Sequence, residues 1–264
     1  MSAVSQAQQI PRLAHTGRVT QLRVALSEWT KLRSLRSTLW SLFAGVLLTI
    51  LLPVLFAAIT SSHWGSMSPH ERADRHPLDI ALAGVNVSQL AIAVLGVLVI
   101  TGEYSTGMIR ASFTAVPKRL PVLWAKTGVF AVVAFLLMLP SVMIAFFASQ
   151  AILSRHHILQ ISFSHPGVAR SVVGGAVYLM LVGIFALGIG AIVRNTAGAI
   201  ATFAGIFFVI PPLMNILPSE AGRQLFSLTH DANSFSPGAG ALLFVGYCAL
   251  TLAIAAVLLV RRDT

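Results

Sequence analysis

Long apolar stretches alternate with short polar ones along most of the chain. A helix needs about 20 mainly apolar residues to cross the hydrocarbon core of a bilayer. The strands of a membrane barrel would be shorter and would alternate apolar with polar positions. No Asp or Glu lies near the centre of any candidate stretch. The pattern therefore predicts six membrane-spanning helices, at about residues 39–60, 82–101, 121–153, 171–193, 197–217 and 239–260.

A segment with the amphipathic pattern of a helix, apolar on one side and polar on the other, precedes the first apolar run. Apolar residues recur every three or four positions from residue 18 to 36, and most of the other positions are polar. This predicts an amphipathic helix in the headgroup plane, with Trp29 at the interface and basic side chains towards lipid phosphates. The helix is either a plain membrane anchor or one that also contacts a cytoplasmic partner. Its candidate contact residues are Leu22, Leu26, Trp29, Lys31 and Arg33.

The chain divides into three parts on this pattern. Residues 1–17 are small and polar and are predicted to be disordered. The interfacial helix follows at 18–36, and residues 37–264 form the transmembrane domain. The expected fold class is an all-α polytopic membrane protein.

Composition excludes a soluble domain and charge sets the orientation. The chain is 56% hydrophobic and only 10% charged, whereas soluble domains carry about 25% charged residues. Lys and Arg concentrate in the N-terminal segment, the second-to-third connection and the C-terminal tail. By the positive-inside rule these parts are cytoplasmic, so both termini are predicted inside. The net charge of +10 then indicates contact with anionic lipid rather than with nucleic acid.

The sequence lacks the motifs of common enzymes. It contains no HExxH, no GxSxG and no GxxxxGK[ST] phosphate loop. We therefore predict that the chain is not an enzyme, and that active transport would draw energy from another chain. Lys126 alone intrudes into a span, near a cytoplasmic end where it can snorkel. A proton-driven transporter would need a buried acid or histidine.

Histidines gather in the predicted outer loops. They are spread over three loops without helical pairing, so solvated side chains are favoured over a metal site. A weak effect of external metal or pH stays open. The outer histidines are His63, His70, His76, His156, His157, His165 and His230.

Small residues align along two of the predicted spans. Such rows let helix backbones approach closely, either within one subunit or between subunits. One row is Ser141, Ala145 and Ser149. The other is the candidate subunit interface, Ala197, Ala201 and Gly205.

The connection between the second and third spans combines basic and apolar side chains, which a plain linker would not need. The stretch GEYSTGMIRASFTAVPKR, residues 102–119, carries basic residues but also Met108, Ile109, Phe113 and Val116. In the cytoplasm these apolar side chains need a surface, either the membrane interface or another protein. Glu103 either orients this segment or forms an ion pair with Arg110 or Lys126.

Three stretches give the chain a resemblance to the membrane subunits of ABC-2-type transporters. The run GEYSTGMIRASFTAVPKRLPVLWAKTGVFA resembles the end of that family's second span and its connection to the third. EWTKLRSLRSTLW resembles the interfacial helix, and GIGAIVRNTAGAIA the turn between the fourth and fifth spans. Ser105 departs from the pattern, because a charged residue is common there. The matching positions in the first run are Glu103, Tyr104, Gly107, Arg110, Pro117, Lys118, Arg119 and Lys126.

The resemblance implies a bacterial plasma-membrane exporter subunit that works with a separate ATPase. In that family two membrane subunits pair, as a homodimer or heterodimer. Each docks on a cytoplasmic ATPase that binds ATP and Mg²⁺, through a coupling helix between spans 2 and 3. An amphiphilic or hydrophobic substrate would suit the apolar spans. A non-pumping sensor or assembly anchor, or less readily a secondary transporter, remains the alternative. The implied ATPase-contact residues are Glu103, Tyr104, Thr106, Gly107, Met108, Ile109, Arg110, Phe113, Pro117 and Arg119.

Overall fold

The structure is a computed structural model that describes residues 21–34, 36–105, 119–155, 160–210, 218–227 and 236–262. These residues form helices and connecting turns, and no strand occurs among them. The described part of the chain holds five helices that are long and apolar enough to cross a membrane. This confirms an all-α fold with the character of a polytopic membrane protein.

The five long helices match five of the predicted spans and extend beyond them. Helix α4, with 29 residues, is about 43 Å long at 1.5 Å per residue, so it exceeds a hydrocarbon core of about 30 Å. The five are α2 (Arg36–His63), continued by the 3-10 turn η1 (Trp64–Ser66), α4 (Pro77–Ser105), α6 (Arg119–Arg155), α7 (Val168–Val193) and α10 (Pro237–Arg262).

The predicted span at 197–217 is described only in part. Helix α8 (Thr196–Ala204) passes into the π-helical turn η2 (Gly205–Val209). Together they form a shorter apolar helix than the five spans. Residues 211–217 lie outside the described part of the chain, so a sixth span stays a prediction.

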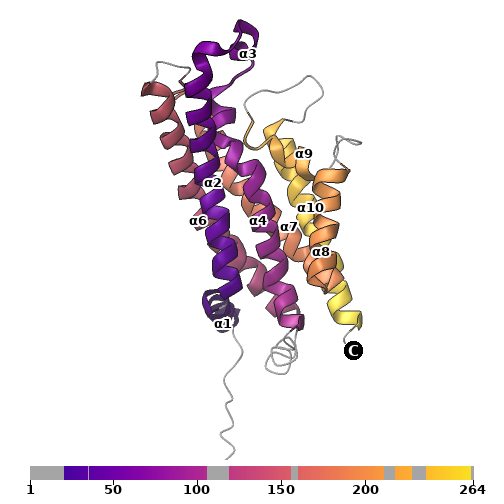
Figure 1. The fold of residues 1–264 in the computed structure, drawn as a ribbon. Helices are drawn as coiled ribbons and strands as arrows, with labels where there is room; N and C mark the ends of the chain where they lie inside the picture. Colours follow the sequence, from indigo (N-terminus) through magenta and orange to yellow (C-terminus); the bar gives the residue numbers. More distant parts are fainter. Residues whose placement is uncertain are drawn as a thin grey trace, which may run out of the picture.

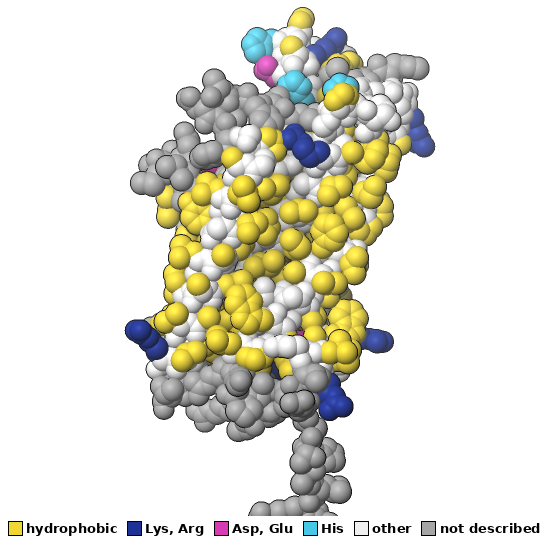
Figure 2. Space-filling model, turned by 180° about the vertical axis from the view of Figure 1, so that it is seen from behind, with side chains coloured by type: hydrophobic (Ala, Val, Ile, Leu, Met, Phe, Trp, Pro, Cys, Tyr) yellow, Lys and Arg dark blue, Asp and Glu magenta, His cyan; other side chains and the backbone are white. Residues whose placement is uncertain are grey.

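Helices α4 and α7 form the centre of the bundle. They are the most buried of the five spans, while α2, α6 and α10 are more exposed. Helix α4 packs on both α2 and α7, and α7 also contacts α6 and α10 (Figure 1). The outer surfaces carry a broad band of apolar side chains, with Lys and Arg at both ends (Figure 2). The band is the surface that a bilayer would cover.

Glycines allow α4 and α7 to cross closely. A Cβ atom on Gly96 would lie 2.2 Å from the carbonyl oxygen of Gly183, which is too close for any side chain. A Cβ on Gly183 would in turn meet the ring of Phe130 in α6. The two glycines therefore let α4 and α7 approach closely, as small residues do in other membrane bundles, and the ring of Phe130 packs against the crossing.

The row Ser141, Ala145 and Ser149 is buried inside the bundle. This row therefore serves internal packing, one of its two predicted roles. Pro53 lies inside the continuous helix α2, and Pro140 lies inside α6.

The two ends of the bundle differ (Figure 1). One end, called here the α1 end, carries the short helix α1 (Gln21–Ser34), the turn between α7 and α8, and the C-terminus of α10. The opposite end carries α3 (Pro69–Ala73) and α9 (Pro218–Arg223). Histidine side chains are visible at this opposite end in Figure 2. The start of α1 and the end of α10 thus lie on the same side, as the predicted topology requires.

Local sequence sets several helix ends. Ser68 and Glu71 form a capping box at the start of α3, in which the Ser68 backbone N–H donates to Glu71 Oε2 over 2.7 Å. The Asn195 side chain accepts a hydrogen bond from the Gly198 N–H over 2.9 Å and so caps α8. Arg194, just before it, ends α7 in the left-handed conformation with φ 58°.

Candidate functional site

Helix α1 turns a mixed face towards the bundle. Its buried residues are Val24, Glu28 and Leu32, spaced four apart. Leu22, Leu26 and Trp29, three of the candidate contact residues of this helix, are exposed, and their contact with membrane or partner stays a prediction. Glu28 occupies one of the polar positions of the predicted amphipathic pattern, but it faces the bundle, because only 2% of this residue is exposed.

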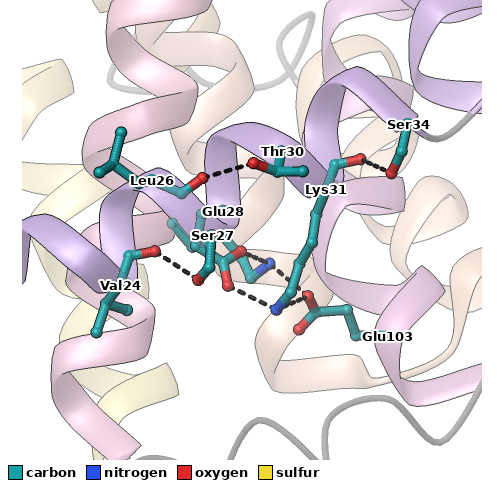
Figure 3. Close-up of polar contacts among 9 residues, drawn as sticks. Val24, Leu26, Ser27, Glu28, Thr30, Lys31, Ser34 and Glu103 are labelled. Carbon is teal, nitrogen blue, oxygen red and sulfur yellow. Dashed lines mark hydrogen bonds and ion pairs between the residues drawn. The ribbon is translucent and has the colours of Figure 1, made fainter. Parts of the chain in front are cut away.

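Glu28 belongs to a cluster of four charged side chains at the α1 end. Lys31 Nζ lies 2.7 Å from Glu28 Oε1 and 2.9 Å from Glu103 Oε1. Lys126 Nζ lies 3.0 Å from the same Glu103 oxygen and also donates to Glu28 Oε2. Figure 3 shows Lys31 reaching from α1 to a point between the two carboxylates. The residues Glu28, Lys31, Glu103 and Lys126 are called the charge cluster below.

The charge cluster joins three helices. Glu28 and Lys31 come from α1, Glu103 from the last turn of α4, and Lys126 from the second turn of α6. Two carboxylates face two ammonium groups, so the cluster is neutral. Each lysine contacts both carboxylates, which offsets the large cost of removing these charges from water.

Lys126 does not snorkel. It was expected to extend to the headgroup region, but only 4% of the residue is exposed and its ammonium group is held between Glu28 and Glu103. The reason is that α1 crosses this end of α6 and supplies a carboxylate there. The predicted pairing of Glu103 with Lys126 is present.

Lys31 lies at the outer edge of the cluster. Burial of its ammonium group lowers its pKa, but the hydrogen bonds and charges of Glu103 and Glu28 outweigh that effect. The pKa of Lys31 is therefore raised above the ordinary 10.5, and the side chain is charged at neutral pH.

Glu103 stands at the point where α4 leads into residues 106–118. Its Oε1 atom accepts from both lysines, whereas its Oε2 atom is buried and receives no hydrogen bond from the described residues. Arg110, the other predicted partner of Glu103, lies outside the described residues.

Tyr104, the next residue, links α4 to the opposite side of the bundle. The guanidinium carbon of Arg194 lies 5.1 Å from the centre of the Tyr104 ring, in a cation–π arrangement. Arg194 also donates to the Leu258 carbonyl of α10 over 3.4 Å. One turn earlier in α4, Thr101 accepts a hydrogen bond from Thr196 of α8 over 2.9 Å. Glu103 thus connects the end of α4 with α1 and α6 on one side, while Thr101 and Tyr104 connect it with α8 and, through Arg194, with α10 on the other.

Most of the predicted ATPase-contact residues lie outside the described part of the chain. These are Thr106, Gly107, Met108, Ile109, Arg110, Phe113 and Pro117; Arg119 begins α6, but its side chain is outside the description as well. Their predicted roles stay predictions.

The candidate subunit interface is open in the single chain. Ala197 and Ala201 are exposed, and a Cβ on Gly205 would meet no atom within 4 Å. This row is free of contacts from the described residues on its outer side, so its role in pairing also stays a prediction.

The opposite end of the bundle holds a polar cleft of about 380 Å³. Asp79 and Asn86 of α4 face Glu220 and Arg223 of α9 across it, and Arg223 Nη1 lies 3.4 Å from Glu220 Oε1. No group of three His, Cys, Asp or Glu suited to a metal ion occurs among the described residues. His70 pairs with Asp74 over 3.1 Å, with both side chains largely exposed.

Sequence reasoning missed two members of this network. Glu28 was assigned to the polar side of α1, although its i, i+4 spacing with Val24 and Leu32 marks an inward face. Arg194 was noted only as part of a turn. Its contact with Tyr104 depends on the left-handed backbone at the end of α7, which the sequence does not signal.

A comparison with known protein families finds none that the chain matches, and a search of curated proteins finds no match either. The interpretation of the charge cluster therefore rests on its own geometry. The cluster brings two carboxylates and two ammonium groups together at one end of the bundle, and each carboxylate is paired with both lysines. It can hold three helices in a fixed relation and pass a displacement of one of them to the others.

Proposed function

We propose that the chain is the membrane-spanning permease subunit of an ATP-driven exporter of the ABC-2 type. It would move an amphiphilic or hydrophobic substrate out of a bacterial cell, using a separate ATPase bound at the α1 end. The resemblance of three stretches to that family supports the proposal. The fold adds support through its apolar spans and through the common side of α1 and the C-terminus.

The position of the charge cluster carries the proposal. Glu103 lies near the start of the connection at residues 102–119, and Lys126 lies beyond its end. Glu103 pairs with Lys31 of α1, and Lys126 pairs with Glu28 of α1 and with Glu103. Both ends of the proposed coupling segment are therefore anchored to each other and to the interfacial helix. A push on that segment would reach α1, α4 and α6 together.

The link from Tyr104 to Arg194 would extend this movement to the other half of the bundle. Arg194 touches α10 and precedes α8 and η2, which carry the row Ala197, Ala201 and Gly205, the candidate contact with a second permease subunit. An ATPase shifts such a unit only if its two nucleotide states bind the segment with different affinity. The proposed cycle thus needs the ATPase to hold the segment differently when ATP closes the ATPase dimer.

The test is a triple substitution of Met108, Ile109 and Phe113 to Asp. If these side chains dock on an ATPase, three new carboxylates in an apolar contact would abolish co-purification of the ATPase and ATP-dependent export. The spans are expected to fold, because none of the three residues belongs to a predicted span. The control is Met67→Asp at the opposite end of the bundle. This variant is expected to keep both co-purification of the ATPase and ATP-dependent export.

Wild-type recovery of the ATPase with the triple variant would contradict docking through this segment. Absence of any Walker-motif ATPase from the wild-type complex would contradict the exporter itself. It would favour the non-pumping anchor or sensor.

A further inference from the structure

An apolar groove of about 950 Å³ lies between α1 and α6 at the α1 end. Apart from Gln21, every residue that lines it is apolar. The α1 wall includes Leu22, Leu26 and Trp29, and the α6 wall includes Trp124, Val132 and Leu136. The lining thus joins the outward face of α1 to the outward face of α6.

The groove has the length of one acyl chain. Its α6 wall runs from Trp124 to Leu137, which is about 20 Å of helix at 1.5 Å per residue. One leaflet contributes about half of a hydrocarbon core of about 30 Å. A single lipid tail entering from the α1 end would therefore lie along most of the groove.

Gly128 keeps the groove open. It lies in the α6 wall, and a Cβ atom added to it would meet nothing within 4 Å. Leu22 and Leu26 of the opposite wall remain 71% and 57% exposed. An apolar occupant such as an acyl chain would pack against these exposed side chains.

The charge beside the groove is positive. Arg33 follows Trp29 by four residues and so lies on the same side of α1, one turn beyond the apolar lining. Arg33 and Arg23 are exposed, whereas the acidic residue of α1, Glu28, is buried and paired with both lysines. The exposed side of α1 thus presents arginine without a competing carboxylate, which suits a phosphate group.

We propose that the groove between α1 and α6 binds a phospholipid with an anionic headgroup, with one acyl chain along Gly128 and the phosphate at Arg33. The lipid would come from the leaflet on the α1 side. The site goes beyond the proposed exporter function and does not depend on it. A lipid seated there would contact the outward face of α1 while the charge cluster holds its inward face.

Tryptophan fluorescence tests occupancy directly. Two of the four tryptophans, Trp29 and Trp124, line the groove. In the full chain with Trp40→Phe and Trp64→Phe, the tryptophan fluorescence would come only from Trp29 and Trp124. Reconstituted into phosphatidylcholine vesicles with a minor fraction of brominated lipid, the protein should be quenched several-fold more by brominated phosphatidylglycerol than by brominated phosphatidylcholine. Equal quenching by the two lipids would overturn the proposal.

Two substitutions separate the contact of the acyl chain along Gly128 from the contact of the headgroup at Arg33. Gly128→Phe fills the groove and should reduce retention of phosphatidylglycerol by the purified protein. The matched control is Gly246→Phe, on the exposed side of α10, where a side chain also has open space. This variant should retain phosphatidylglycerol as the wild type does. Arg33→Gln should lower the preference for phosphatidylglycerol about fivefold, from about 1 kcal/mol for a basic residue near an anionic surface.

Other occupants give other results. If residues 1–17 fill the groove, deleting them should raise quenching by both brominated lipids equally. If a second copy of the chain fills it, Gly128→Phe should dissociate an oligomer that Gly246→Phe leaves intact. Either result would overturn the lipid assignment.

Discussion

Glu28 and Lys126 are two charged residues held where a membrane protein would ordinarily place apolar side chains. Each is at most 4% exposed; Glu28 and Lys126 pair with each other, Glu28 also pairs with Lys31, and Lys126 also pairs with Glu103. Replacing one member of such a group costs more than the interaction it loses, because its partner remains buried and uncompensated. The loss of stability on replacing one of these residues therefore depends on which of the others are present.

The first prediction is a double-mutant cycle on Glu103→Gln and Lys126→Met. Each single change should destabilise the fold by about 3–5 kcal/mol, because a buried charge loses its partner. The double variant should lose less than the sum by about 0.5–3 kcal/mol. The midpoint of thermal unfolding in detergent measures this. Glu220→Gln, in an exposed pair with Arg223, is the control, with an effect of about 0–1 kcal/mol. Additive effects would show that the two side chains are not coupled.

A second prediction concerns the pH dependence of Lys31. Its pKa is raised in the folded state, so its contribution is fully present below the ordinary 10.5 and is lost as the pH rises through the higher folded value. The difference in thermal midpoint between wild type and Lys31→Met should therefore be constant from neutral pH to about pH 10, and should shrink above 10.5. A difference that vanishes near pH 8 would contradict the ion pairs of Lys31.

Helix packing depends on the crossing of α4 and α7 at Gly96 and Gly183. A methyl group at Gly96 would collide with a backbone oxygen, which cannot rotate away as a side chain can. Gly96→Ala should therefore separate the helices and destabilise the protein by about 1–3 kcal/mol, an ordinary cost of overpacking. Gly246→Ala, where a Cβ has open space, should leave thermal stability unchanged or slightly higher. Equal behaviour of the two variants would mean that the helices do not meet so closely.

The spans could be predicted from the sequence because apolar length alone identifies a helix that crosses a bilayer. Five predicted runs are confirmed as long apolar helices. Helix α1 was recognisable from its period, but its inward face was not. The reason is that Glu28 pairs with Lys126 of α6, a contact that joins residues distant in the sequence. Hydrophobic periodicity cannot anticipate a charge that is buried through a partner on another helix.

At the scale of the whole molecule, the α1 end gathers the features that favour contact with other molecules. The charge cluster, the Tyr104–Arg194 contact and the entry to residues 106–118 all lie there, as does the groove beside α1. The opposite end holds the polar cleft and exposed histidines. An exporter needs such a division, with an energy-coupling side and a release side.

The most direct test of the proposed exporter is site-specific photocrosslinking in living cells. A photoreactive amino acid at Phe113 should give a covalent adduct with an ATPase that carries Walker motifs. The same amino acid at Trp64, at the opposite end of the bundle, should give none. An ATPase adduct from Phe113 alone is the predicted result. No ATPase adduct from Phe113, in cells that express the full-length chain, would contradict the assignment of this chain as an ATPase-coupled permease.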